Sequence, residues 1–291
     1  MAHTNKIVVT GAHGQLGWEI GQLANAYPQY EFVLLDRSTL DLAQPEKIEA
    51  VISSIQPFCV INTAAYTAVD KAETEQEQAL KINVTAVTLL AQMCKKYQIH
   101  FITFSTDYVF DGKATHPYLP NHTIDPVNFY GVSKAKGEEG AITENEQSII
   151  IRTSWVFSSH GNNFVKTMLR LMKERSQLNI VADQVGRPTY AKDLASATML
   201  MVAALDAGKK IQGIYHYANE GIISWYDFAV QIKQNAGLSC ALNPIHTDQF
   251  PTPAKRPSYS VLDTQLIEKE LDLSIRNWKD ALNECQNKLV S

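Results

Sequence analysis

The first half of the chain alternates short apolar runs with longer segments in which apolar residues recur every three or four positions. Short runs rich in Val, Ile, Leu and Phe predict strands, and the segments between them predict amphipathic helices. Runs this apolar are typical of strands buried on both faces, and intervening helices are typical of a parallel sheet. The strands are predicted at residues 6–10, 31–36, 58–62, 100–106 and 148–155.

The second half keeps helices and strands but loses the regular alternation after Trp155. A serine at position 224 can cap a helix over 225–236, and a last helix is predicted over 277–290. The pattern predicts an α/β fold, a Rossmann-type doubly wound parallel sheet with a smaller C-terminal part. We expect a first domain over 1–155 and a second part over 156–291, with some later segments returning to the first domain.

Composition narrows the class of protein. The 291 residues are 45% hydrophobic and 19% charged, which is enough to bury a sizeable core. The net charge of −4 lacks the basic excess of a nucleic-acid binder. No run of about 18 apolar residues predicts a membrane span, and the start "MAHTNKIVVTG" lacks the pattern of a signal peptide. A cytoplasmic protein is expected.

The four cysteines are scattered along the chain. Cys59 and Cys94 lie in apolar segments, and no two cysteines form a CxxC pair with each other. We expect buried, reduced thiols, with no disulfide and no metal site built from cysteine.

A glycine-rich loop follows the first predicted strand. Gly11, Gly14 and Gly17 come directly after the strand and at the opening of the next helix. Glycines let the backbone approach a pyrophosphate closely, and a helix N-terminus supplies unpaired N–H groups. The spacing is GxxGxxG rather than GxGxxG, so the position between strand and helix carries the argument. Residues 1–155 are therefore predicted to bind NAD(P).

The second strand ends on a carboxylate. Asp36 lies about 20 residues beyond the glycines, where a carboxylate can accept hydrogen bonds from the adenosine ribose. Arg37 follows at once, and a guanidinium there could hold a 2′-phosphate. NADPH and NADH both remain open.

Polar residues stand where the fourth strand ends. Ser105, Thr106 and Asp107 follow "HFITF", and the carboxyl ends of parallel strands face the ligand crevice. Tyr130 and Lys134 come next, four residues apart, which places both on one face of a helix. A free phenol has a pKa of about 10, and a nearby ammonium lowers that pKa. The pair is predicted to be a proton donor and the cation that tunes it.

The motifs "TGAHGQLG", "STDYVFDG" and "YGVSK" together resemble the extended short-chain dehydrogenase/reductase superfamily. Within it, the chain is similar to the family of dTDP-4-dehydrorhamnose reductases, through "NTAAYTAVDKAE", "RTSWVF", "DQVGRPTYAKDLA" and "RPSYSVLD". The matching motifs run from residue 11 to residue 263. The resemblance implies an oxidoreductase of dTDP-rhamnose biosynthesis that uses NADPH or NADH to reduce the C4 ketone of a dTDP-linked 4-keto-6-deoxysugar, and it implies a homodimer.

The resemblance also implies roles for single residues. Tyr130 would donate a proton to the C4 oxygen, Lys134 would also bind the nicotinamide ribose, and Thr106 would hold the carbonyl oxygen. A polar helix residue, Asn83, is a weaker candidate that could equally bond locally. The implied cofactor residues are Gly11, Gly14, Gln15, Leu16, Gly17, Asp36, Arg37, Asp41, Leu42, Ala64, Ala65, Tyr66, Tyr130 and Lys134; the implied substrate residues are Thr106, Asp107, Trp155, Asn163 and Arg256.

Two departures and two alternatives complete the prediction. Some relatives hold Mg²⁺ through carboxylates at a dimer contact; Glu19 matches one such position, but Lys192 stands where another would lie, so no metal is expected. Asp107 and Tyr108 replace the Asp-Glu pair of dehydratases.

The alternatives are another nucleotide-sugar reductase or epimerase of the superfamily, and a non-catalytic subunit resembling the regulatory subunit of methionine adenosyltransferase. The residues "AKGEE" after Lys134 are expected to be the solvated back of their helix.

Overall fold

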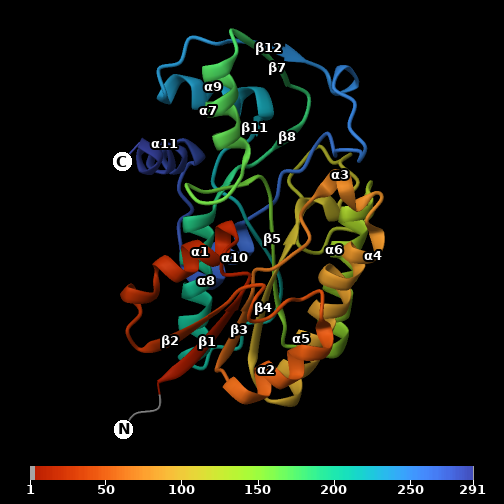
Figure 1. Cartoon of the computed structure of the whole chain (residues 1–291), viewed down its shortest axis with the longest axis vertical. Coiled ribbons are helices and arrows are strands. Elements are labelled where there is room, and N and C mark those ends of the chain that lie inside the picture. The colour runs from red at the N-terminus through yellow and green to blue at the C-terminus, as the bar shows by residue number, and fades with distance from the viewer. Residues whose placement is uncertain (1–3, 291) are drawn as a thin grey trace.

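A six-stranded sheet forms the centre of the molecule (Figure 1), in a computed structural model that describes residues 4–290. All its neighbouring strands run parallel, in the order β10-β5-β4-β3-β1-β2. The order reverses beside β1, and ligands of doubly wound sheets bind where the order reverses. The predicted parallel α/β sheet is confirmed. Its strands are β1 (Asn5–Thr10), β2 (Tyr30–Leu35), β3 (Cys59–Asn62), β4 (His100–Thr106), β5 (Ile149–Thr153) and β10 (Gly213–Tyr217).

Helices cover both faces of the sheet, which explains the continuous apolar runs of its strands. Side chains alternate along a strand, so Ile7 and Val9 pack on one face and Val8 on the other. The first face packs against α1 (Gln15–Gln22), α8 (Ala191–Asp206) and α10 (Gln265–Leu271), and the second against α2 (Ile48–Ile55), α5 (Ala86–Lys96) and α6 (Phe129–Glu144).

The long helix predicted near 75–97 is interrupted. It consists of α4 (Gln76–Leu80), a π-helical turn over Lys81–Thr85, and α5. Asn83 lies in that turn, where its side chain bonds both backbone groups of Tyr66 and the hydroxyl of Ser133. Asn83 therefore fixes the loop after β3 and joins it to α6. The short α3 (Val69–Ala72) precedes α4.

A smaller part stands above the carboxyl ends of the strands in Figure 1. Aromatic side chains, among them Phe157, Phe228 and Trp278, form its core. Ser224 caps α9 through a reciprocal capping box with Asp227, as the sequence predicts. The helices of this part are α7 (Phe164–Glu174), α9 (Trp225–Asn235) and α11 (Trp278–Val290); its strands are β6 (Val156–Phe157), β7 (Gln177–Val181), β8 (Val185–Gly186), β9 (Thr189–Tyr190), β11 (Ile223–Ser224) and β12 (Ala241–Ile245).

The chain crosses between the two parts more than once. After β6, α7 and β7 it returns to the sheet with α8 and β10, and β10 pairs with β5 at the sheet edge. It then builds α9 and β12, returns with α10, and ends in α11.

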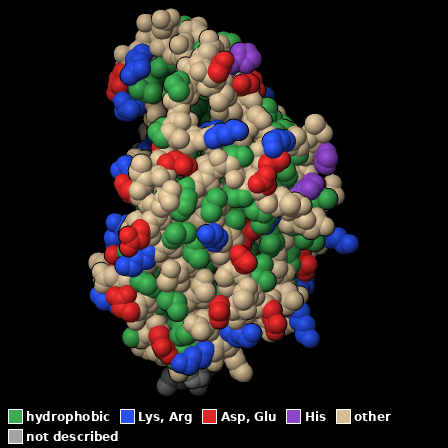
Figure 2. All heavy atoms as spheres, turned by 90° about the vertical axis from the view of Figure 1, so that its right-hand side faces the viewer, with side chains coloured by type: hydrophobic (Ala, Val, Ile, Leu, Met, Phe, Trp, Pro, Cys, Tyr) green, Lys and Arg blue, Asp and Glu red, His purple; other side chains and the backbone are tan. Residues whose placement is uncertain are grey.

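Acidic and basic side chains are interspersed on the face seen in Figure 2, without a large patch of one sign. All four cysteines are buried free thiols, as predicted. Among residues 4–290, no helix is both long and apolar enough to cross a membrane.

Candidate active site

The glycine loop is shaped by close backbone contacts. Gly11 has a positive φ of 69°, which disfavours residues with a side chain. A Cβ atom at Gly17 would lie 2.4 Å from the carbonyl oxygen of Gly11, so α1 can pack against the loop only without one. Gly14 is the N-cap of α1 and leaves the first N–H groups of that helix without a side-chain cap. A backbone of this kind fits a pyrophosphate at a helix N-terminus.

A cavity of about 510 Å³ lies between this loop and helix α6. It brings together residues that are far apart in the sequence. Most of the predicted cofactor residues line it; Gly17 and Tyr66 do not. Those that do are Gly11, Gly14, Gln15, Leu16, Asp36, Arg37, Asp41, Leu42, Ala64, Ala65, Tyr130 and Lys134.

Asp36 lies at the edge of this cavity with Arg37 and His13. Its Oδ1 accepts bonds from the Ser38 hydroxyl and from the backbone N–H groups of Ser38 and Thr39. These bonds lower the pKa of Asp36 to about 2. Oδ2 lies 3.6 Å from His13 Nε2. The carboxylate is therefore charged at neutral pH, and the hydrogen bonds that Oδ1 accepts fix its orientation.

Tyr130 and Lys134 lie on the first turns of α6, where both line the cavity. Asn128 caps this helix by accepting a bond from the Gly131 N–H. Lys134 Nζ donates to the carbonyl oxygen of Phe104, 2.7 Å away. Burial lowers the pKa of Lys134 to about 8, and the charge of Glu138 opposes this.

The acidity of Tyr130 differs from the prediction. Burial raises its pKa well above the usual value, with the contact from Thr106 lowering it and the charge of Asp107 raising it. Lys134 is not among the groups that shift this pKa, and its ammonium donates to the Phe104 carbonyl oxygen. The phenol is therefore protonated at neutral pH.

Asp107 is a buried carboxyl at the end of β4. Its Oδ1 accepts a bond from the Thr106 hydroxyl, whereas its Oδ2 has no partner among residues 4–290. Burial raises the pKa of Asp107 to about 6, partly offset by the hydroxyls of Ser260 and Thr106. Thr106 also accepts a bond from the Tyr108 N–H. Thr106 thus bonds the Asp107 carboxyl and lies close enough to the Tyr130 phenol to lower its pKa.

Trp155, an implied substrate residue, has one face of its ring covered by another aromatic ring. Its ring stacks on Trp225 with the ring centroids 3.6 Å apart. The backbone of Gly186 comes so close that a Cβ there would lie 2.7 Å from Cε2 of the indole. Trp155 also has a positive φ of 48°, which is unusual for an aromatic residue. Contacts with the Trp225 ring and the Gly186 backbone therefore hold the indole in place. Trp155 does not line the 510 Å³ cavity.

Two predicted substrate residues have protein partners. Arg256 forms two hydrogen bonds with Asp70, so it is an ion-paired residue rather than a solvated one. Asn163 caps α7 and donates to Gln15 Oε1 and to the carbonyl oxygen of Ser158. Neither residue lines the 510 Å³ cavity.

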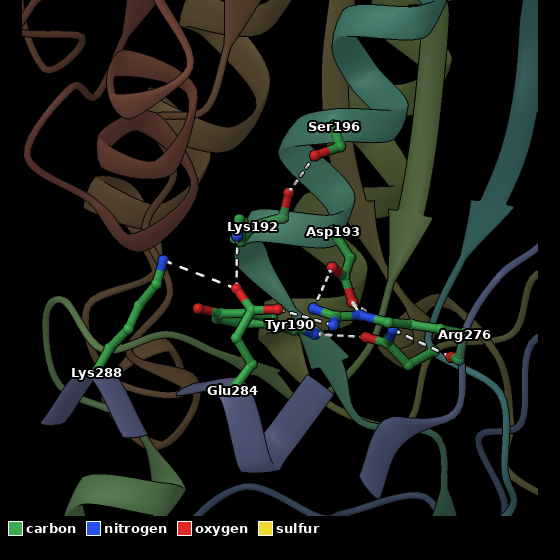
Figure 3. Close-up of polar contacts among 8 residues, drawn as sticks. Tyr190, Lys192, Asp193, Ser196, Arg276, Glu284 and Lys288 are labelled. Atoms are coloured by element: carbon green, nitrogen blue, oxygen red, sulfur yellow. Dashed lines mark hydrogen bonds and ion pairs between the residues drawn. The ribbon is translucent and has the colours of Figure 1, made fainter. Parts of the chain in front are cut away.

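Two lysines, Lys192 and Lys288, and the carboxylate of Glu284 act on Glu19, the position compared with a metal site in the sequence. Glu19 is buried and accepts a bond from the Ser158 hydroxyl, and burial raises its pKa. Figure 3 shows Glu284 between Lys192, Arg276 and Lys288. Within residues 4–290 no cluster of three His, Cys, Asp or Glu residues could hold a metal ion. The donor set does not fit a divalent cation, and the absence of a metal stays a prediction.

Two residues beside the site have surroundings that were not predicted from the sequence. Glu138 and Gly137, expected on the solvated back of α6, are buried instead. Glu138 pairs with Arg152, a charged residue in the middle of the apolar run "IIIRT". Because a buried charge requires a partner, Arg152 in this apolar run was the sequence signal that an acidic partner is buried nearby.

Comparisons with known proteins agree with one another. The family model described as RmlD substrate binding domain matches residues 5–291. A dTDP-4-dehydrorhamnose reductase of Aggregatibacter actinomycetemcomitans is 42% identical over 284 residues, which cover 95% of this chain and 97% of that protein. The crystal structure of a dTDP-4-dehydrorhamnose reductase from Clostridium acetobutylicum has a TM-score of 0.92 at 38% identity, over 98% of this chain and all of that one. The same enzyme from Bacillus anthracis, solved in complex with NADP, has a TM-score of 0.92 at 34% identity, with the same coverage.

Proposed function

Since this chain belongs to the family of the RmlD substrate binding domain, we propose that it catalyses the NAD(P)H-dependent reduction of dTDP-4-dehydro-L-rhamnose to dTDP-L-rhamnose. The observation that carries this proposal is the 510 Å³ cavity, because the glycine loop, Tyr130 and Lys134 all line it. A nicotinamide cofactor bound there supplies the hydride that is added to C4 of the sugar.

The protein's own part in the reaction is binding and proton transfer. The glycine loop and the N-terminus of α1 hold the pyrophosphate, and Asp36 with Arg37 holds the adenosine ribose. Lys134 donates to the hydroxyls of the nicotinamide ribose. Asp41 and Leu42 border the adenine, and Ala64 and Ala65 border the phosphates.

Tyr130 supplies the proton that balances the hydride. Its phenol O–H donates to the C4 oxygen as the ketone becomes an alcohol, while Thr106 holds that oxygen beside it. A raised pKa suits this direction of reaction, because the phenol stays protonated until negative charge develops on the substrate oxygen.

The sugar nucleotide is proposed to lie between the two parts of the molecule. Asp107 and Trp155 flank the sugar, and Asn163 and Arg256 hold the diphosphate. Because the Trp155 ring is stacked, we assign its indole edge rather than its face to the sugar. Asp70 uses one hydrogen of Nη1 and one of Nη2, so Arg256 would share its guanidinium between Asp70 and the diphosphate.

The deciding experiment follows NADPH and NADH oxidation with dTDP-4-dehydro-L-rhamnose. A reductase oxidises one cofactor for each sugar consumed, whereas an epimerase or a regulatory subunit consumes none. The Tyr130→Phe variant keeps the buried ring and removes the proton donor, so it should lose at least about a hundredfold in kcat while binding cofactor as before. Stoichiometric oxidation by Tyr130→Phe at the wild-type rate would refute the assignment of Tyr130.

We also propose a cytoplasmic location and a homodimer. Four buried thiols without a disulfide fit a reducing compartment. The homodimer is implied by resemblance, and sedimentation equilibrium tests it directly.

A further inference from the structure

A buried ion pair lies behind the catalytic helix. Arg152 on β5 and Glu138 on α6 are 1% and 4% exposed. Arg152 Nε donates to Glu138 Oε1 over 2.9 Å, and Nη2 donates to Oε2 over 2.6 Å. This two-bond geometry fixes both side chains.

The arginine is also held from its other side. Its Nη1 donates to the Pro120 carbonyl oxygen over 3.0 Å and lies 3.4 Å from His216 Nε2. Burial first, and Arg152 second, lower the pKa of His216 to about 3, so the ring is neutral. Because His216 Nδ1 lies 3.1 Å from the Tyr118 carbonyl oxygen, Nδ1 carries the hydrogen and Nε2 accepts from Arg152. The guanidinium therefore has partners on both sides, Glu138 on one and Pro120 with His216 on the other.

Glu138 and Lys134 face the same internal space. They are four residues apart on α6, and both line a cavity of about 10 Å³ together with Ser105. The Ser105 hydroxyl is buried and has no partner among residues 4–290. The space suits one water molecule, which could bond the hydroxyl, the ammonium and the carboxylate.

The charges around Lys134 come from several elements. Glu138 and Tyr130 share its helix, Asp107 follows β4, and Arg152 on β5 stands behind Glu138. His13, Asp36 and Arg37 line the cofactor cavity that Lys134 also lines. Lys134 itself is only 6% exposed, so a change in a neighbouring charge is weakly screened.

We propose that Glu138 is a positioning residue for the reduction: its carboxylate, fixed by Arg152, keeps Lys134 charged and in place at the back of the cofactor cavity. This inference rests on the proposed function, in which the Lys134 ammonium binds the cofactor ribose. Glu138 itself does not line the cofactor cavity.

The two partners of the ion pair give opposite expectations. Glu138→Gln leaves Arg152 as an unpaired cation near Lys134, so the ammonium loses its proton at lower pH. Arg152→Gln leaves the carboxylate unpaired, so the ammonium persists to higher pH. We expect shifts of about one pH unit or more in each direction. A purely structural role would weaken both variants alike without opposite shifts.

The measurement is the NADPH dissociation constant between pH 6 and pH 10, from quenching of protein fluorescence without sugar, with the kcat profile beside it. Exposed Glu139→Gln, one residue further on, is the matched control and should leave the profile unchanged. If either single variant fails to fold, the Glu138→Gln/Arg152→Gln double variant replaces it, because the double variant has no unpaired buried charge. Its NADPH dissociation constant should begin to rise at a lower pH than that of the wild type.

The inference is overturned if a folded Glu138→Gln protein, or the double variant, keeps the wild-type pH dependence of the NADPH dissociation constant. Failure of the proposed function is a separate result: the wild-type chain would then not bind NADPH or not oxidise it with the sugar.

Discussion

Arg256 and Asp70 form a two-bond ion pair, with Nη1 2.6 Å from Oδ1 and Nη2 2.9 Å from Oδ2, although 186 residues separate them in the chain. The pair ties the loop after β12 to α3, beside the main sheet. Asp70 also accepts a bond from the Ala254 N–H, so the carboxylate holds the loop backbone as well.

Removing this guanidinium should weaken binding of the sugar nucleotide. We expect Arg256→Ala to raise the dissociation constant of dTDP on the order of tenfold to a hundredfold, the value of one or two charge-assisted bonds. Asp70→Asn should instead tighten dTDP binding, because it removes the competing carboxylate charge. Isothermal titration with dTDP measures both, and exposed Arg175→Ala is the control. An unchanged constant in folded Arg256→Ala would remove this residue from the site.

Asp107 should make stability depend on pH. Its folded pKa of about 6 lies above the value of about 3.9 for an unfolded chain. Between these values the folded state keeps a proton that the unfolded state has lost, so stability falls as pH rises from about 4 to about 6. The full cost, on the order of 3 kcal/mol, is then present at higher pH.

Asp107→Asn cannot ionise and should escape this cost. The stability gain of the variant, from chemical denaturation, should grow between pH 4 and pH 6 and then stay constant to pH 8. Asp111→Asn is an informative control, because hydrogen bonds lower the pKa of Asp111 and its removal should cost stability at neutral pH. A difference between Asp107→Asn and wild type that does not vary with pH would contradict the burial argument.

Arg37 should decide part of the cofactor preference. It lines the cavity next to Asp36, whose negative charge disfavours a 2′-phosphate. We expect Arg37→Ala to weaken NADPH binding about tenfold and to leave NADH binding nearly unchanged. Fluorescence titration with each cofactor measures the ratio. An equal loss for both cofactors would show that Arg37 does not read the 2′ position.

The three cations around Glu284 in Figure 3, Lys192, Arg276 and Lys288, should make the protein independent of divalent cations. EDTA should leave the Tm and kcat of the wild type unchanged. Lys192→Glu removes one of the three cationic partners of Glu284 and adds a carboxylate near Glu19, so its Tm should fall in EDTA and rise again with millimolar Mg²⁺. Wild-type activity that EDTA abolishes and Mg²⁺ restores would contradict the prediction.

The strands and the glycine loop could be predicted because their signals are local. "KIVVTGAHGQLG" contains a strand, a turn and a helix start within a dozen residues. The pairing of β10 with β5 joins segments that are some 60 residues apart, and no local pattern specifies it. The division near residue 155 stays a prediction.

Side-chain partners were the least predictable part of the site. Helical spacing placed Tyr130 and Lys134 together, but the ammonium donates to Phe104, a residue of a different element. Glu138 looked solvated because its neighbours in the chain are polar, and its actual partner lies on a strand. The stacking of Trp155 on Trp225 likewise joins residues 70 positions apart.

The late return of the chain to its sheet has a consequence for synthesis on the ribosome. The face covered by α2, α5 and α6 can be assembled from the first 150 residues. The opposite face carries Ile7, Ile61 and Ile102, and much of its cover comes from α8 and α10, which are made later. Until those helices emerge, one side of the nascent sheet and the edge of β5 are open, which is a hazard for aggregation. A chain truncated near residue 155 should therefore require a chaperone to remain in solution.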